Sequence, residues 1–299
     1  MNSQTASKFG KSSTAEEVTA GIDLSGKVAL VTGINSGIGT ETLRVLAQRG
    51  AVVIGTARSM AKATEACRQV PGSIPLACEL ESQDSIRACV KEIAKLGRPL
   101  DICIANAGIM ALPRLEQVNG IEKQFATNHL GHFLLINLLR PQIDAANGAR
   151  VVIVSSSAHT QAPAGGIEFD NLSGERRYGA LRAYGQSKLA NVLFAKALAR
   201  RLGEGRSANA LHPGVINTNL GRNINPLISA VLGVLFRPFG KTIPQGAATT
   251  CYVATRPELR AVTGQYFADC AVVEPSRLAR DEALSERLWE VSEQLTGLR

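Results

Sequence analysis

The chain has 299 residues, 45% hydrophobic and 19% charged, a composition typical of a globular protein long enough for one α/β domain. Its 33 basic and 25 acidic residues give a net charge of +8, which favours anionic partners such as cofactor phosphates. Aromatic residues make up 4%, and no basic tract is interleaved with them, so we expect no nucleic-acid partner.

Neither the cysteines nor the N-terminus indicates secretion. The six cysteines lie in apolar segments without a CxxC pair or a histidine partner, which predicts reduced core residues, a cytoplasmic location and no metal site. The first 25 residues hold no apolar run long enough for a signal peptide. We interpret residues 1–23 as an N-terminal arm, in which the capping-box spacing of Ser13 and Glu16 predicts a short helix.

From Lys27 onward, short β-branched runs alternate with helical stretches. This order predicts an α/β fold, a single-domain, doubly wound parallel sheet of Rossmann type with helices on both faces, over residues 24–299. The predicted strands are 28–32, 52–56, 74–78, 100–105, 150–155 and 207–212, and the predicted helices are 37–48, 61–69, 83–96, 120–139 and about 181–202.

A glycine-rich turn joins the first predicted strand to the first helix. Glycines let the backbone turn tightly and approach a phosphate, and a helix N-terminus supplies free N–H groups. The position of the turn predicts a dinucleotide site formed by Gly33, Asn35, Ser36, Gly37, Ile38 and Gly39.

The second predicted strand is followed by Arg58, with no acidic residue at its end. A carboxylate here would bind a ribose 2′-hydroxyl and repel a 2′-phosphate, whereas a guanidinium matches the phosphate. The sequence therefore predicts NADP(H) rather than NAD(H). The alternative is a solvated arginine at a strand end.

Tyr184 and Lys188 stand four residues apart at the start of a long helix, so they project from one face. A nearby cation stabilises a phenolate, lowers the phenol pKa and makes the hydroxyl usable in proton transfer. The alternative is an ordinary tyrosine with a surface lysine one turn later.

Four motifs follow in order: Thr32-Gly33-x-x-x-Gly37-x-Gly39, Asn106-Ala107-Gly108, Tyr184-x-x-x-Lys188 and Pro213-Gly214. Together they resemble the short-chain dehydrogenase/reductase family over about residues 24 to 270. Segments 124–133 and 182–191 resemble its retinol dehydrogenase and WW-domain oxidoreductase branch, and 13–18 and 244–253 resemble plant members associated with chloroplast protein import. A plant source would therefore imply a chloroplast association.

This resemblance implies roles for the catalytic residues. Tyr184 would be the general acid in reduction and the base in oxidation, and Lys188 would lower its pKa and hold the nicotinamide ribose. Asn128, an unusual residue within an apolar helix, would hold a water that relays protons to Lys188.

Three consecutive serines, Ser155, Ser156 and Ser157, are candidates for the residue that binds the substrate carbonyl. The family pattern Val-Ser-Ser-x-Ala-His favours Ser156. We interpret His129, His132 and His159 as packing or capping residues rather than ligands.

The resemblance also implies cofactor contacts outside the glycine-rich turn. Thr218 would bind the nicotinamide carboxamide, and Glu79 replaces the aspartate that usually receives the adenine amino group, so we expect that contact to be altered. The remaining predicted contacts are Leu80, Asn106, Ala107, Gly108, Pro213 and Gly214.

The segment from Ile224 to Phe236 is apolar nearly all round. We interpret it as part of a substrate lid near residues 219–243, which favours a lipophilic carbonyl or alcohol. Alternatively, it would dock on a membrane surface as a peripheral contact. The predicted function is NADP(H)-dependent hydride transfer, and the alternative is an NADP(H)-binding, redox-sensing subunit of a larger complex.

A homodimer is a further expectation. The helices beginning near Gly120 and Leu181 carry more apolar residues than the sheet can cover, and many family members pair these helices across a two-fold axis. The residues concerned are Phe133, Leu134, Leu138, Val192, Phe194 and Leu198.

Overall fold

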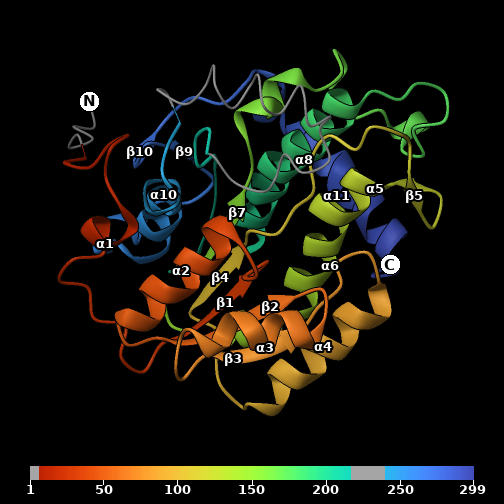
Figure 1. Ribbon diagram of the computed structural model, residues 1–299. Helices are drawn as coiled ribbons and strands as arrows, with labels where there is room; N and C mark the ends of the chain where they lie inside the picture. Colours follow the sequence, from red (N-terminus) through yellow and green to blue (C-terminus); the bar gives the residue numbers. More distant parts are fainter. Residues whose placement is uncertain (1–6, 217–239) are drawn as a thin grey trace.

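The computed structural model describes residues 7–216 and 240–299, and it confirms the predicted α/β fold (Figure 1). Its main sheet has eight strands in the order β10-β9-β8-β7-β4-β1-β2-β3, with every neighbouring pair parallel except β9 and β10. The strands are β1 Val28–Thr32, β2 Val52–Ala57, β3 Ile74–Ala77, β4 Ile102–Ala105, β7 Arg150–Val154, β8 Ser207–Leu211, β9 Tyr266–Ala268 and β10 Ala271–Val272.

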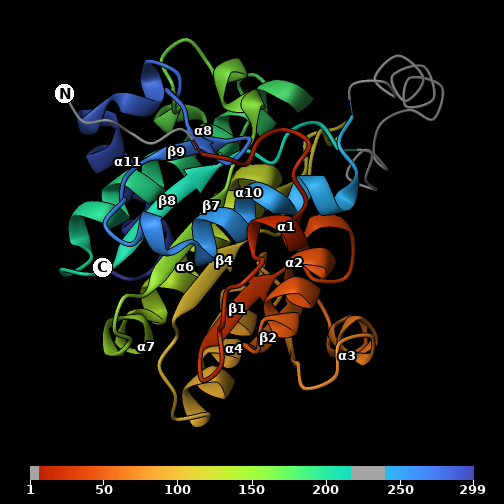
Figure 2. The ribbon, with the colours of Figure 1, turned by 90° about the vertical axis from the view of Figure 1, so that its left-hand side faces the viewer.

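Helices cover both faces of this sheet (Figures 1 and 2). Successive side chains of a strand point to opposite faces, so Val28 and Leu30 of β1 join one core cluster, while Ala29 and Val31 join the other. One face carries α2 Gly37–Gln48, α3 Met60–Arg68 and α10 Ile243–Thr255; the other carries α4 Gln83–Lys95, α6 Gly131–Leu138, α8 Ala180–Arg201 and α11 Glu282–Thr296.

Most predicted elements are found within two residues of their expected limits. The predicted helix 120–139 is an exception, because Ile121–Glu122 (β6) pairs with Gln117–Val118 (β5) in a small hairpin. The helical path therefore begins with α5 Lys123–Phe125 and continues through a π-helix, η1 Ala126–Leu130, into α6, which α7 Arg140–Ala145 follows.

The N-terminal arm packs against the domain. Its helix α1, Ala15–Val18, lies on α2 and α10 (Figure 2), and Ala15 and Val18 are fully buried there. The capping box is one residue later than predicted: Thr14 caps the helix, and its backbone N–H donates to the Glu17 carboxylate at 2.8 Å.

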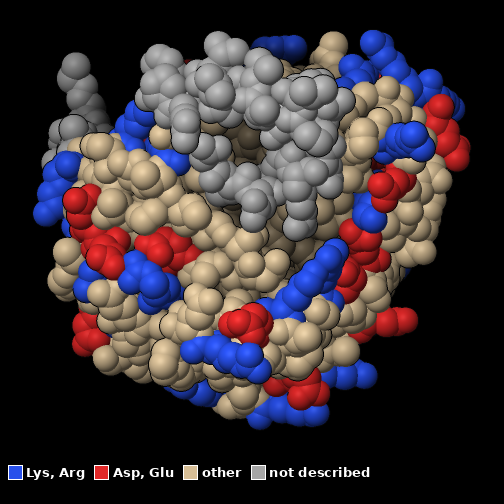
Figure 3. Space-filling view, in the orientation of Figure 1, with Lys and Arg blue, Asp and Glu red and all other residues tan. Residues whose placement is uncertain are grey.

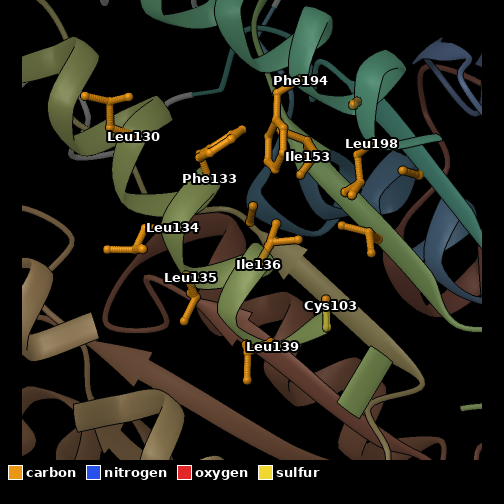
Figure 4. Packing of buried hydrophobic residues seen from close by; sticks show 14 of the residues in the cluster. Cys103, Leu130, Phe133, Leu134, Leu135, Ile136, Leu139, Ile153, Phe194 and Leu198 are labelled. Atoms are coloured by element: carbon orange, nitrogen blue, oxygen red, sulfur yellow. The ribbon is translucent and has the colours of Figure 1, made fainter. Parts of the chain in front are cut away.

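Helix α11 covers the surface from which the homodimer was predicted. The Trp289 ring lies 4.9 Å from the Phe133 ring and 5.9 Å from the Phe194 ring, measured between centroids. Figure 4 shows Phe133 and Phe194 turned toward each other inside this core. The residues that motivated the dimer are buried within the chain, except for half-buried Leu138, so they do not form the uncovered apolar face on which that expectation rested. The homodimer itself stays a prediction.

All six cysteines are buried with free thiols, as the sequence predicted for core residues. Basic and acidic side chains are interspersed on the face shown in Figure 3. Among the described residues, none of the helices combines the length and apolarity required to cross a membrane.

Candidate active site

The predicted site residues gather at the carboxyl edge of the parallel strands. The chain runs from β1 outward to β2 and β3, then returns to place β4 on the other side of β1. Doubly wound sheets bind ligands in the crevice between loops that diverge at such a reversal of strand order, so the binding crevice is expected beside β1. The loops after β1, β2, β3, β4, β7 and β8 all reach this edge.

The glycine-rich turn is shaped for close backbone contacts. Gly33 and Gly37 have φ of 73° and 60°, the left-handed region that favours glycine. A methyl group on Gly39 would lie 2.2 Å from the Gly33 carbonyl oxygen, so a side chain has no room there. The Ser36 side chain makes no capping bond to α2, which leaves the helix N-terminus available for an anion. This geometry fits a dinucleotide phosphate.

Thr32 joins this turn to the predicted Asn106-Ala107-Gly108 contact. Its hydroxyl oxygen accepts hydrogen bonds from the backbone N–H groups of Asn106 at 2.9 Å and Ala107 at 3.0 Å. The Asn106 side-chain amide donates to the Thr32 carbonyl at 2.8 Å. We did not predict a role for Thr32, although its place as the first residue of the glycine motif was a usable signal.

Tyr184 and Lys188 are almost completely buried on α8. The Lys188 ammonium donates to the Val154 carbonyl at 3.1 Å and lies 5.7 Å from the centre of the Tyr184 ring. The Ser155 hydroxyl donates to the Lys188 carbonyl at 2.7 Å, which fixes this turn of α8 against the end of β7. These contacts hold the pair at the carboxyl end of β7.

Burial dominates the protonation of both groups. It raises the pKa of Tyr184 to about 12, against an opposing effect of a hydrogen bond with Ser156. It also lowers the pKa of Lys188 to about 8. The net shift of the tyrosine pKa is upward, because the loss of hydration destabilises the phenolate more than the hydrogen bond with Ser156 stabilises it. A lowering of this pKa by Lys188 stays a prediction. At neutral pH the phenol keeps its proton.

The three serines have different environments. Ser155 is buried, and its hydroxyl is bonded to the Lys188 carbonyl, while Ser157 is exposed. Ser156 is half-buried, accepts a bond from the Ala158 N–H at 3.2 Å and is the serine that influences Tyr184. Its surroundings favour Ser156 for the predicted role.

His159 holds the backbone of Ser156 in place. Its Nδ1–H donates to the Ser156 carbonyl at 2.8 Å, and its Nε2 accepts from the Ser276 N–H at 3.1 Å. The Tyr266 hydroxyl lies 3.3 Å from the same Nδ1. His159 is therefore a packing residue, as interpreted from the sequence. It is the last residue of the pattern Val-Ser-Ser-x-Ala-His, and that position was the sequence signal for its contact with Ser156.

Asn128 lies in the π-helix η1 and is fully buried. Its side chain accepts from the Ile109 N–H at 2.8 Å and donates to the Ile109 carbonyl and the Ser187 hydroxyl, both at 2.9 Å. A methyl group on Gly108 would lie 3.1 Å from Asn128 Oδ1 and 3.5 Å from Lys188 Nζ. The structure thus brings Gly108, Asn128 and Lys188 together. Single π-helical turns within α-helices are frequent at functional sites.

The predicted adenosine end lies beyond β2 and β3. Arg58 is exposed directly after β2, and its charge acts on the half-buried Glu79. Burial, with the nearby Glu81, raises the pKa of Glu79, and Arg58 opposes this shift. The backbone of Leu80 lies close to the start of α6, since a methyl group on Gly131 would lie 2.5 Å from the Leu80 carbonyl oxygen.

The nicotinamide end is described in part. Gly214 follows β8 with φ of 94°, and the buried Lys241 side chain lies beside it, paired with Asp269 at 2.6 Å. Thr218 and the predicted lid segment Ile224–Phe236 lie outside the described residues, so the structure says nothing about either.

Comparison with known proteins agrees with this geometry. The family model for short chain dehydrogenase matches residues 27–228. The chain belongs to the short-chain dehydrogenase family. "Short-chain dehydrogenase TIC 32 B, chloroplastic" from Brassica napus is 45% identical over 300 residues, which cover 96% of this chain and 93% of the relative. "Retinol dehydrogenase 14" from Homo sapiens is 39% identical over 295 residues, which cover 91% of this chain and 87% of the relative.

A solved structure shares the architecture as well. The crystal structure of an uncharacterized protein from Mycobacterium paratuberculosis has a TM-score of 0.75 and 33% identity, covering 94% of this short-chain dehydrogenase and 97% of the neighbour. The predicted family and branch are confirmed: this dehydrogenase is an oxidoreductase of a family that uses nicotinamide cofactors.

Proposed function

We propose that this dehydrogenase is an NADP(H)-dependent oxidoreductase that transfers a hydride between nicotinamide and the carbonyl or alcohol carbon of a lipophilic substrate. The observation that carries the proposal is the convergence of Tyr184, Lys188, Asn128 and Ser156 beside a glycine-rich turn with a free helix N-terminus. A bound nicotinamide would supply or accept the hydride. The protein would orient the substrate and handle the proton.

The protein's own part in the reduction is proton donation. The Tyr184 hydroxyl would give its proton to the developing alkoxide, and the Ser156 hydroxyl would hold the same oxygen. A phenol pKa of about 12 keeps Tyr184 protonated at neutral pH, the form that reduction requires. Lys188 would bind the nicotinamide ribose, and Asn128 would hold the water that returns a proton to this lysine.

Exposed apolar side chains next to predicted site residues in the sequence support a lipophilic substrate. Leu181, three residues before Tyr184 on α8, is 55% exposed, and Val215, directly after Gly214, is 57% exposed. Exposed apolar side chains beside a site favour contact with an apolar ligand. The similarity to proteins named retinol dehydrogenase points to the same class of substrate.

The cofactor preference rests on Arg58. NADPH is expected to bind at least about tenfold more tightly than NADH, a difference of about 1.4 kcal/mol. Replacing Arg58 with alanine removes the guanidinium that would pair with the 2′-phosphate, so the preference should largely disappear. Fluorescence titration with both cofactors measures this change.

Arg68→Ala is the matched control, because Arg68 is an exposed arginine of α3 paired with Glu65. It should leave both affinities unchanged. Equal binding of NADPH and NADH by the wild-type protein would contradict the assignment of NADP(H).

A further inference from the structure

His132 connects two parts of the candidate site that come from distant parts of the sequence. It lies in the first turn of α6 and is fully buried. Its Nδ1 is 3.0 Å from the Asn128 carbonyl oxygen, and its Nε2 is 2.9 Å from the Thr32 hydroxyl oxygen. One ring therefore contacts both the π-turn that carries Asn128 and the end of β1.

The partners determine the direction of each hydrogen bond. A carbonyl oxygen only accepts, so Nδ1 must carry the proton and donate to Asn128. In the neutral ring Nε2 then accepts, and the Thr32 hydroxyl donates to it at 2.9 Å rather than to the Ile104 carbonyl oxygen, which lies farther away at 3.4 Å. Thr32 is left with oxygen lone pairs for the backbone N–H groups of Asn106 and Ala107, which it holds at 2.9 and 3.0 Å.

The environment of the ring favours this neutral form. Burial is the main cause that lowers the pKa of His132 to about 4, and the charge of Lys188 acts in the same direction. A protonated ring would present an N–H to Thr32 and compete with the two backbone donors. The neutral ring completes the network with every member paired.

We propose that His132 is a positioning residue that couples the Asn106–Gly108 loop to the π-turn at Asn128 through the Thr32 hydroxyl. It would touch neither cofactor nor substrate. It acts by holding the hydroxyl in the orientation that accepts both backbone N–H groups. The effect on cofactor affinity rests on the proposed NADP(H) function, but the coupling itself concerns contacts within the protein.

His132→Asn separates the two bonds of the ring. Asn137, one turn further along the same segment, donates its side-chain amide to the Phe133 carbonyl four residues earlier at 2.8 Å. An asparagine at position 132 would make the equivalent bond to the Asn128 carbonyl but is too short to reach Thr32. We expect this variant to bind NADPH about tenfold more weakly, measured by fluorescence titration.

A double-mutant cycle with Thr32→Val tests whether the effect passes through the hydroxyl. Thr32→Val alone should weaken NADPH binding by at least as much as His132→Asn. Adding His132→Asn to Thr32→Val should change the dissociation constant by less than about twofold, since the link is already broken. In Thr32→Ser, which keeps the hydroxyl, His132→Asn should regain its full effect.

His129→Asn is the matched control. His129 is also fully buried in the same segment, and its Nε2 lies 2.9 Å from a hydroxyl, that of Ser292 on α11. This variant should lower the melting temperature but leave NADPH affinity within about twofold. A merely structural role for His132 would instead make the two histidine variants behave alike.

Amide hydrogen exchange of the protein without cofactor gives an independent readout. His132→Asn should speed exchange at Asn106 and Ala107, and His129→Asn should not. If His132→Asn does not fold, the same acceleration is expected for Thr32→Val. Unchanged exchange at both amides, or an undiminished effect of His132→Asn in Thr32→Val, would overturn the inference. Absence of NADPH binding by the wild-type protein, with accelerated exchange in the variant, would contradict only the proposed function.

Discussion

Replacing Tyr184 with phenylalanine is expected to lower kcat by at least about two orders of magnitude, the contribution typical of a positioned proton donor. The ring is 5% exposed, so phenylalanine retains its packing and loses only the hydroxyl. Because the predicted phosphate and ribose contacts remain, NADPH affinity should change by less than about threefold. Steady-state kinetics and fluorescence titration of the same preparation separate the two quantities.

Tyr252→Phe provides the control for this loss. Tyr252 is also 5% exposed, but it lies on α10, where its ring packs against Phe9 of the N-terminal arm. Turnover by this variant should match the wild type. Full turnover by Tyr184→Phe with a competent substrate would rule out the tyrosine as the proton donor.

Replacing Gly39 with alanine is expected to weaken NADPH binding by about a hundredfold or more, close to 3 kcal/mol. The added methyl group would lie 2.2 Å from the Gly33 carbonyl oxygen and 2.7 Å from the Asn106 side-chain nitrogen. Both neighbours belong to the loops that form the dinucleotide site, so relief of the clash must displace one of them. Titration with NADPH measures the loss, and a thermal melt measures the accompanying destabilisation.

Gly165→Ala is the corresponding control, because nothing lies within 4 Å of the methyl group it would add. Its affinity and melting temperature should equal those of the wild type. Wild-type affinity in Gly39→Ala would show that the turn does not contact the cofactor.

Local patterns predicted the parts of the fold that depend on neighbouring residues. The β-branched run of β1, the helix after the glycine-rich turn and the long helix of Tyr184 were all found. The hydrophobic periodicity and the turn residues that predict these elements lie within short stretches of the chain. Helical spacing placed Tyr184 and Lys188 on one face of a helix, whereas the choice of Ser156 came from the resemblance to the family and not from local periodicity.

Features that depend on distant contacts could not be predicted in this way. Helix α11 covers Phe133 and Phe194, and no pattern within α6 or α8 shows that the covering residue, Trp289, lies 156 and 95 positions further along the chain. The bond between His132 and Thr32 likewise joins residues 100 positions apart. The raised pKa of Tyr184 follows from burial, which the spacing of Tyr184 and Lys188 does not reveal.

Transfer of deuterium from NADPH labelled at the nicotinamide C4 position to a panel of retinoid, steroid, quinone and aldehyde carbonyls tests the central claim most directly. The account predicts that at least one lipophilic carbonyl becomes an alcohol with deuterium on its carbinol carbon, and that Tyr184→Phe forms almost none. Tight NADPH binding without transfer to any carbonyl of the panel would contradict the proposed enzyme and favour the redox-sensing subunit.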